Sequence, residues 1–272
     1  MIKTNDLSFK YSKGGSPIFD NLNIEIGNEV NSNSNICGLL GENGVGKTTF
    51  LRLLSGLLFP KQGKIEVNGF NPRNRSAEFL SQIYYFPENI ESIEKNIQKY
   101  AEMYAPFYPD FSRGNFEYCL SEFGVNPHMS VNALSHGNRK KALLSFALAC
   151  NTPVLLLDEP TNGLDIPSKT VFRRLLLEFA NNAAGKTIII STHQVREVED
   201  IIDPIIIMEY NRILLNNSVK EIKEKFSNGA LNSALNGALS NNAVLENDKL
   251  NLEALFNMAI ENKAVFENTF LK

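Results

Sequence analysis

Apolar and polar positions alternate along the first part of the chain in the period-two pattern of half-buried strands. The pattern covers residues 2–11 and 19–26, and it returns at residues 64–67, directly before the turn pair Asn68-Gly69. Short alternating segments separated by glycine-containing turns are typical of antiparallel strands. We therefore expect a small antiparallel sheet in the N-terminal part of the chain.

Continuous apolar runs mark a second set of strands, which occupy residues 36–40, 154–157 and 187–191. Runs that are apolar at every position predict buried strands. Helical patterns follow at residues 49–54, 167–180 and 195–202. Residues 205–208 and 212–215 predict a hairpin with Asn211 near its turn. The alternation of strands and helices predicts an α/β core.

Between about residues 93 and 133 the pattern becomes helical, and Pro106, Pro109 and Pro127 interrupt it. We interpret this part as a mostly helical insertion. It is rich in aromatic residues, namely Tyr100, Tyr104, Phe107, Tyr108, Phe111, Phe116, Tyr118 and Phe123. These side chains fit two interpretations: a core of the insertion itself, or an exposed patch that binds a partner.

The composition changes again after residue 217. Residues 228–242 repeat Ala-Leu-Asn and Gly-Ala-Leu units with weak helical character, whereas residues 250–260 have better helical spacing. We interpret residues 218–272 as a C-terminal tail of uncertain order that lies outside the active site.

Composition restricts the classes of function. The 272 residues are 43% hydrophobic, which suffices for a large buried core, and the formal net charge is −3. With that charge and no long Lys/Arg tract, nucleic-acid binding is not expected. The three cysteines lie in apolar contexts, which fits a reducing compartment.

The sequence gives no sign of an export signal or a membrane span. Residues 1–6 lack the apolar stretch of a secretory signal, and no uncharged apolar run approaches the ~20 residues that span a bilayer. We expect a chain that is soluble by itself and that needs a partner for any work at a membrane.

The clearest chemical motif is Gly41-Glu42-Asn43-Gly44-Val45-Gly46-Lys47-Thr48, which matches the phosphate-loop pattern G-x-x-x-x-G-K-[ST]. It lies between a predicted strand and a predicted helix. Glycines allow backbone N–H groups to turn toward phosphate oxygens, and the helix N-terminus adds the positive end of its dipole. Lys47 is expected to bind the β- and γ-phosphates of ATP, and Thr48 to bind Mg²⁺.

A second motif occupies residues 134–165. A Ser-x-Gly turn at Ser135 opens an apolar helical segment, and the breaker Asn151-Thr152-Pro153 ends it. The apolar strand 154–157 then leads directly into Asp158 and Glu159. Two carboxylates at the end of a buried strand are costly unless a cation meets them. Together with the phosphate loop, this motif predicts an ATPase.

In these motifs the chain resembles the nucleotide-binding subunits of the ATP-binding cassette (ABC) ATPases, over roughly residues 1–217. The resemblance rests on five motifs: Walker A at residues 41–48, the signature Leu134-Ser135-His136-Gly137-Asn138, Walker B at residues 154–159, the D-loop at residues 162–165 and the switch histidine His193. Residues 86–88 and 107–111 are similar to bacterial transport ATPases of the antibiotic-export and stress-response type.

The resemblance implies an α/β fold, with a P-loop NTPase (RecA-like) core, an antiparallel β subdomain and an inserted α-helical signature subdomain. The core and its β subdomain would comprise residues 1–92 and 150–217, and the helical subdomain residues 93–149.

The resemblance also implies roles for single residues. Asp158 would bind Mg²⁺, and Glu159 would be the general base for the attacking water. Lys47 and His193 would join Glu159 in catalysis, and Tyr11 would stack on the adenine ring. The residues expected to contact ATP are Tyr11, Gly41, Asn43, Gly44, Gly46, Lys47, Thr48, Thr49, Ser135 and Gly137.

Three positions depart from the family pattern. His136 replaces the first signature glycine, Asn138 replaces the signature glutamine, and Glu88 stands where the family has the Q-loop glutamine. A carboxylate at that position is still expected to hold Mg²⁺ or orient a water, so Glu88 joins Thr48 and Asp158 as a predicted metal ligand.

One subunit supplies half of such a site. In the family, the signature of one subunit covers the ATP bound to the Walker A loop of another, so Ser135 and Gly137 would face a γ-phosphate. The resemblance therefore implies a homo- or heterodimer that closes around two ATP molecules and powers a separate membrane-spanning permease. It also implies a cytoplasmic location, peripheral on the inner face of the cell membrane.

Two other functions stay open. One is a soluble ABC ATPase that drives a non-transport assembly, such as cluster assembly, translation or DNA maintenance, and the other is a nucleotide-binding regulator without turnover. The single Walker A motif and the absence of long heptads argue against the translation and DNA-repair types. The retention of Lys47, Asp158, Glu159 and His193 argues against the regulator.

Overall fold

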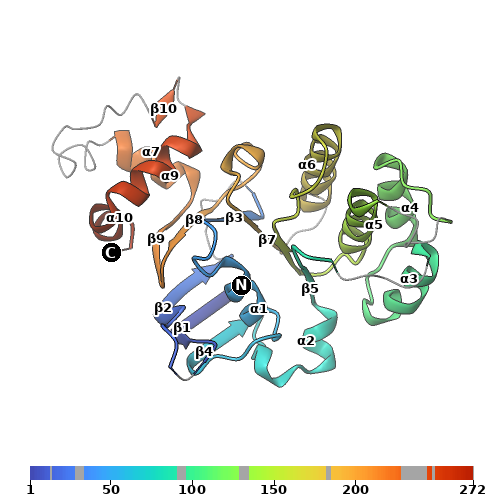
Figure 1. The fold of residues 1–272 in the computed structure, drawn as a ribbon, viewed down its shortest axis with the longest axis horizontal. Helices are drawn as coiled ribbons and strands as arrows, with labels where there is room; N and C mark the ends of the chain where they lie inside the picture. Colours follow the sequence, from blue (N-terminus) through green and yellow to red (C-terminus); the bar gives the residue numbers. More distant parts are fainter. Residues whose placement is uncertain are drawn as a thin grey trace. The chain divides into compact units, whose positions relative to one another are not determined.

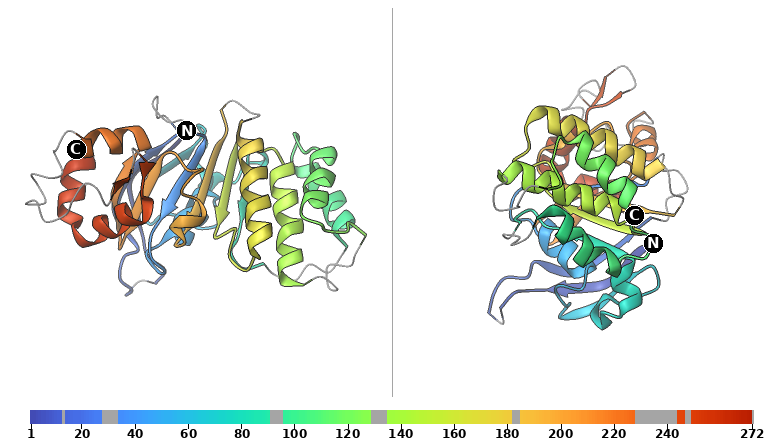
Figure 2. Two further views of the ribbon diagram at one scale, coloured as in Figure 1. Left: turned by 90° about the horizontal axis from the view of Figure 1, so that it is seen from above. Right: turned by 90° about the vertical axis from the view of Figure 1, so that its right-hand side faces the viewer.

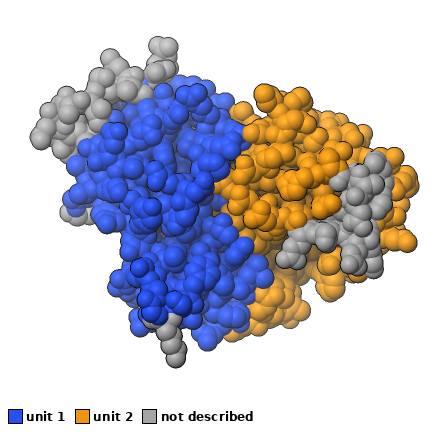
Figure 3. Space-filling view, viewed as in Figure 1, with its two compact units in different colours: residues 1–73, 191–272 blue, residues 74–190 orange. Residues whose placement is uncertain are grey.

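The computed structural model describes residues 1–271 except 13, 28–33, 91–95, 129–134, 182–184, 228–243 and 247–248. The chain divides into two compact units, which Figure 3 shows in different colours. Unit 1 combines residues 1–73 with residues 191–272, and unit 2 is the continuous stretch of residues 74–190. Each unit is described by itself.

Three antiparallel strands form the first sheet of unit 1, in the order β2-β1-β4 (Figure 1). They are β1 (Ile2–Phe9), β2 (Phe19–Ile26) and β4 (Gln62–Val67). Ile2 lies opposite both Ile26 and Val67, and all three are buried, so the apolar positions of the strands share one face. The predicted antiparallel sheet is confirmed.

Unit 1 also holds β3 (Ile36–Leu40), β8 (Ile205–Glu209) and β9 (Arg212–Asn217). β3 pairs with β8 in parallel, and β8 pairs with β9 in an antiparallel hairpin. Every residue of β3 and β8 is buried, as their apolar sequences predict. Asn211 has a left-handed φ of 58° in the hairpin turn, which confirms the predicted turn. The helix α1 (Lys47–Leu54) comes after β3 in the chain.

The described residues of the C-terminal part belong to unit 1 and pack against its β8–β9 hairpin. They form α7 (Val219–Ser227), the two-residue strands β10 (Leu245–Glu246) and β11 (Lys249–Leu250), α9 (Leu252–Glu261) and α10 (Lys263–Phe270). Lys263 and Glu209 form an ion pair at 2.5 Å, and Arg212 pairs with Glu267 at 3.0 Å, so α10 is tied to the β8–β9 hairpin (Figure 1). The predicted helix at residues 250–260 corresponds to α9, and the Ala-Leu-Asn repeats lie outside the described residues.

The helix predicted at residues 195–202 is wrong. Only a single 3-10 turn, η4 (Val195–Glu197), forms there. Val198, Ile201 and Ile202 are nevertheless buried. The apolar spacing therefore reflects burial in an irregular segment that ends at Asp203-Pro204.

Unit 2 places helices beside a parallel pair of strands, β5 (Ile83–Phe86) and β6 (Val154–Asp158). β7 (Thr187–Thr192) neighbours β6, and its last two residues belong to unit 1. The helices are α2 (Ala77–Ser81), α3 (Ile97–Tyr104), α4 (Arg113–Glu122), α5 (His136–Ala149) and α6 (Ile166–Asn181), with the 3-10 turns η1 (Pro72–Asn74) at the unit boundary and η2 (Ala105–Phe107). α5 lies between α4 and α6 (Figure 2).

Aromatic side chains form the core of the helical part of unit 2. Phe146 of α5 is fully buried and lies 5.1 Å from Tyr100, 5.2 Å from Phe111 and 6.0 Å from Phe116, measured between ring centroids. Phe107, in contrast, is 66% exposed. The interpretation as a core is therefore confirmed for Phe146 and the rings around it, whereas Phe107 is exposed, and partner binding by exposed rings stays a prediction.

Of the helices in the described part of the chain, none is both long and apolar enough to cross a membrane.

We predict that Phe146→Ala lowers the free energy of unfolding by about 3–5 kcal/mol, because the truncation opens a cavity among several rings. Urea-induced unfolding followed by far-UV circular dichroism measures this change. Phe107→Ala is the control, since an exposed ring should change the free energy by less than about 0.5 kcal/mol. Equal effects of the two substitutions would contradict the aromatic core.

Candidate functional site

The phosphate loop of unit 1 joins β3 to α1 and is held together by its own lysine. The Nζ atom of Lys47, which is buried, donates hydrogen bonds to the carbonyl oxygens of Gly41 at 2.7 Å and Glu42 at 3.0 Å. Lys47 is also the first residue of α1, so the helix dipole adds to the positive potential of its ammonium group. The loop therefore presents a positively charged turn that suits phosphate oxygens.

Two glycines of this loop occupy positions where a side chain would not fit. A Cβ atom on Gly41 would lie 2.6 Å from the carbonyl oxygen of Met208. Gly46 has a φ of 112°, and a Cβ atom there would lie 2.9 Å from the side chain of Ile18. The glycine positions of the sequence motif thus correspond to real packing constraints.

Two other predicted site residues, Tyr11 and His193, also belong to unit 1. The hydroxyl groups of Tyr11 and Thr49 are 2.9 Å apart, so Tyr11 lies beside the first turn of α1. Tyr11 is 57% exposed, and its ring and that of Phe9 form a T-shaped pair with centroids 5.1 Å apart. His193 directly follows β7 and is partly exposed.

In unit 2 the predicted carboxylates lie at the end of a strand that is buried at every position. Asp158, the last residue of β6, is fully buried and accepts a hydrogen bond from the Tyr85 hydroxyl at 3.1 Å. Glu159 is also buried and has a left-handed φ of 45°. Non-glycine residues seldom adopt this conformation, and functional sites often hold such strained residues. The left-handed turn ends the strand and redirects the chain.

A buried lysine holds the turn that follows. Lys140 of α5 is 1% exposed and donates hydrogen bonds to the carbonyl oxygens of Glu159 and Asn162, both at 2.8 Å. Its Nζ atom lies 5.8 Å from the centroid of the Phe86 ring. Burial lowers the pKa of Lys140 to about 8, although the carboxylates of Glu88, Glu159 and Asp158 act in the opposite direction.

The segment that follows Glu159 lies along the first turns of α5. A Cβ atom on Gly163 would meet the ring of His136 at 3.6 Å, and Lys141 pairs with Asp165 at 3.5 Å. Asn162 also donates its side-chain amide to Glu88 at 3.0 Å. The predicted D-loop, the signature residues and Glu88 are therefore brought together within unit 2.

Ser135 begins α5, as the sequence predicts. Its hydroxyl oxygen accepts a hydrogen bond from the backbone N–H of Asn138 at 3.2 Å, and the residue itself is exposed. The next residues, His136 and Gly137, are at least partly exposed, so this helix end is accessible to a partner or ligand. Leu134 of the predicted signature lies outside the described residues.

The residues predicted to bind Mg²⁺ offer suitable chemistry. The hydroxyl of Thr48 and the carboxylates of Asp158 and Glu88 are the hard oxygen donors that Mg²⁺ prefers. Among the described residues there is no group of three or more His, Cys, Asp or Glu side chains that could hold a metal ion. Mg²⁺ does not require such a group, since it is commonly held by one or two carboxylates together with substrate phosphates.

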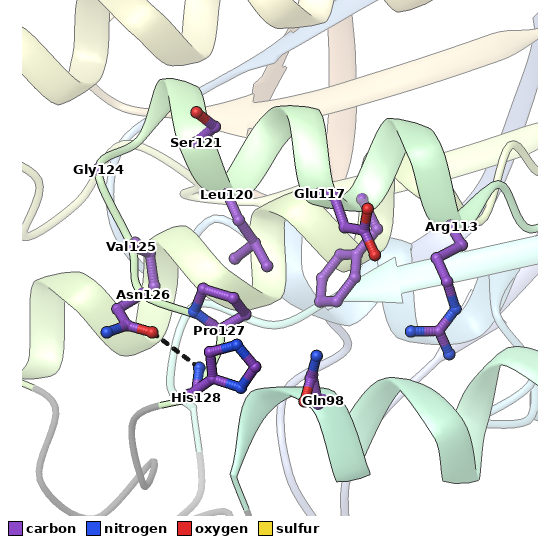
Figure 4. A pocket seen from close by; sticks show the side chains of 11 residues that line it. Gln98, Arg113, Glu117, Leu120, Ser121, Gly124, Val125, Asn126, Pro127 and His128 are labelled. Carbon is purple, nitrogen blue, oxygen red and sulfur yellow. Dashed lines mark hydrogen bonds between the residues drawn. The ribbon is translucent and has the colours of Figure 1, made fainter.

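A pocket of about 560 Å³ lies elsewhere in unit 2, between α3 and α4 (Figure 4). The polar side chains that line it are Gln98, Arg113, Glu117, Ser121, Asn126 and His128. None of the predicted site residues lines it, so it lies apart from the motifs described above.

The sequence reasoning missed Lys140 and Tyr85. A signal for Lys140 was present, because residues at spacings of four and seven share one helix face. Lys140, Leu144 and Ala147 have this spacing and all three are buried. No comparable signal marks Tyr85, since its contact with Asp158 depends on the pairing of β5 with β6.

A family model and individual known proteins match this chain, and their descriptions agree with one another. A family model described as ABC transporter matches residues 27–162. The ABC transporter ATP-binding protein NatA of Bacillus subtilis is 30% identical over 205 residues, which cover 72% of this chain and 82% of that protein. The bacitracin transport ATP-binding protein BcrA of Bacillus licheniformis is 30% identical over 229 residues, which cover 83% and 72%.

A solved structure of an ATP binding subunit of an ABC transporter has the same fold. It matches with a TM-score of 0.71 at 23% identity, over 83% of this chain and 93% of that one.

Lys140 should make the stability of the chain depend on pH. Its pKa is about 8 in the folded chain against the usual 10.5, so below pH 8 it is protonated in both the folded and the unfolded chain. Between these values the unfolded chain binds the proton more strongly, so the free energy of unfolding should rise by at most about 1.4 kcal/mol per pH unit. We expect this rise in urea unfolding of the wild type relative to Lys140→Met. A constant difference between the two proteins from pH 8 to 10 would contradict the lowered pKa.

Proposed function

The chain belongs to the ABC transporter family, and from this premise we propose that it is the ATP-hydrolysing subunit of a transporter whose permease is a separate polypeptide. The predicted α/β P-loop NTPase fold is confirmed by the solved structure of the transporter subunit described above. The observation that carries the proposal is the buried pair Asp158 and Glu159, found in the same chain as a complete phosphate loop.

The phosphate loop supplies the charge that ATP binding requires. Lys47 has its ammonium group at carbonyl oxygens of its own loop, and we propose that it binds the β- and γ-phosphates from there. The proposed ATP contacts of this loop are Gly41, Asn43, Gly44 and Gly46, with Thr48 and Thr49 at the start of α1. Tyr11 stacks on the adenine ring in this proposal, which its exposure and its contact with Thr49 support.

Glu159 is the proposed general base. Its carboxylate takes a proton from the attacking water, and His193 orients that water or Glu159. When bound, Mg²⁺ neutralises phosphate charge. Thr48, Asp158 and Glu88 are the proposed ligands, and one oxygen of Glu88 is already fixed by Asn162.

A second subunit completes the proposed site. Ser135 and Gly137 lie at the accessible N-terminal end of α5, a helix of 14 residues whose dipole favours an anion there. In this proposal they contact the γ-phosphate of ATP held by the partner. The proposed division of the chain is a core of residues 1–92 and 150–217, a helical signature subdomain of residues 93–149, and a C-terminal tail of residues 218–272.

Replacement of Glu159 by glutamine tests its proposed role as the base. Glu159→Gln should lower ATP turnover by at least about 100-fold, because the amide cannot accept the proton of the water. It should bind ATP with unchanged affinity and accumulate as an ATP-dependent dimer in gel filtration. Near-normal turnover in steady-state phosphate release would remove Glu159 from this role.

A second substitution tests the proposed contact of Ser135 with the partner subunit. In the Glu159→Gln chain, the further change Ser135→Arg should prevent the dimer while leaving ATP binding by the monomer intact. A dimer that persists in this double variant would show that the signature end of α5 does not face the partner.

Transport is the proposed use of the hydrolysis. The permease would bind the exposed aromatic residues of the helical subdomain, such as Phe107, which are the kind of surface that marks protein interfaces. BcrA, whose name describes bacitracin transport, supports placing the chain near antibiotic-export ATPases. The subunit would then be cytoplasmic and held at the inner face of the membrane by its permease.

Affinity capture from detergent-solubilised membranes of the source organism tests this proposal. We expect the tagged chain to recover a protein with several apolar spans, and Phe107→Asp to reduce that recovery. Tyr210→Asp is the control, because Tyr210 has a similar exposed fraction, 60% against 66%, but lies in unit 1. Recovery of a soluble assembly without any membrane protein would favour the non-transport alternative.

A further inference from the structure

The proposed roles leave one buried group of the site without an assignment, the ammonium of Lys140. It reaches from α5 to the turn after β6 and binds two carbonyl oxygens that lie three residues apart, those of Glu159 and Asn162. A single ammonium thereby links both ends of one turn. Hydrogen bonds from a charged donor are stronger than neutral ones, so these two bonds tie the turn to α5.

The turn has a conformation that needs such support. The left-handed φ of Glu159 costs energy and persists only where the surroundings hold it. The backbone N–H of Asn162 also donates to the Glu159 carbonyl at 3.2 Å, so this oxygen accepts hydrogen bonds from two directions. These two hydrogen bonds therefore hold the backbone of Glu159 in place, and with it the Cα atom from which the side chain extends.

We propose that Lys140 is a positioning residue for hydrolysis: it fixes the backbone from which the Glu159 carboxylate projects and ties that backbone to the helix that Ser135 begins. This inference rests on the proposed role of Glu159 as the base. Lys140 does not contact the reacting atoms, and its effect passes through Glu159. The contact of Lys140 is made to the main chain, so it persists when the side chain at position 159 is changed.

A double-mutant cycle tests the proposal. Lys140→Met removes the donors but keeps the length and the apolar stem of the side chain. We expect kcat to fall about 10- to 100-fold, since misplacement of a catalytic group by about 1 Å has effects of this size. The KM for ATP should change less than about threefold, because the Lys47 loop lies in the other unit.

The second arm of the cycle repeats the change in the Glu159→Gln chain. Here Lys140→Met should alter the residual turnover by less than about twofold, because the group that Lys140 positions is already inactive. An equal fall in both backgrounds, or full turnover of Lys140→Met alone, would overturn the proposal. The proposed function fails separately, namely when Glu159→Gln alone retains turnover.

Lys186→Met is the matched control. Lys186 is a second lysine of unit 2 whose pKa burial lowers, and it donates to Asn151 at 2.5 Å at the opposite end of β6. Its substitution should leave kcat within about twofold of the wild type. Equal losses in Lys186→Met and Lys140→Met would reduce the role of Lys140 to general stability.

Thermal melting establishes that each variant is folded. If Lys140→Met does not fold, Lys140→Gln carries the same cycle, because its amide keeps two N–H donors on a shorter side chain. We expect it to lower kcat in the wild-type background and to leave the residual turnover of Glu159→Gln unchanged. Wild-type kcat in folded Lys140→Gln would also overturn the proposal.

Discussion

In each unit, a buried lysine ammonium bound by main-chain carbonyl oxygens holds a turn that carries predicted site residues. Lys47 binds the carbonyls of Gly41 and Glu42, and Lys140 binds those of Glu159 and Asn162. A buried charge without partners is very costly, so each turn must keep its carbonyls directed at the ammonium. This requirement restricts the conformation of both turns. It therefore also fixes where the other residues of the turns lie.

The strand β6 shows how stability and function compete at the same place. Its apolar residues stabilise the unit, yet the strand ends in a fully buried carboxylate and a glutamate with a left-handed backbone. Neither feature favours folding. Tyr85 and Lys140 offset part of the cost through hydrogen bonds to the Asp158 side chain and the Glu159 carbonyl. Departures of this kind from the rules of stable folding are expected at functional sites.

The sequence predicts the parts of the fold that depend on local pattern. The apolar runs of β3 and β6, the Ser135 cap of α5 and the Asn211 turn all follow from short-range rules, and the structure confirms them. The motifs also predict Lys47, Asp158 and Glu159 as site residues, because binding of a phosphate and its cation restricts residue type and spacing.

Local sequence pattern does not predict contacts between strands of the sheet or between distant segments of the chain. The bonds of Tyr85 to Asp158 and of Asn162 to Glu88 join residues more than 70 positions apart. The wrong helix prediction for the segment after His193 has a related cause. Neighbouring elements bury this segment, and buried positions are apolar whether or not the backbone is helical.

The interrupted course of unit 1 along the chain has a consequence for its biosynthesis. Gly38 of β3 pairs with Ile205 of β8, and all of unit 2 is translated between them. At typical elongation rates the first strands must wait roughly 10 to 30 s for this partner to leave the ribosome. Unit 2, being continuous, can complete its core during that delay, while the nascent β3 keeps an apolar edge that chaperones would have to shield.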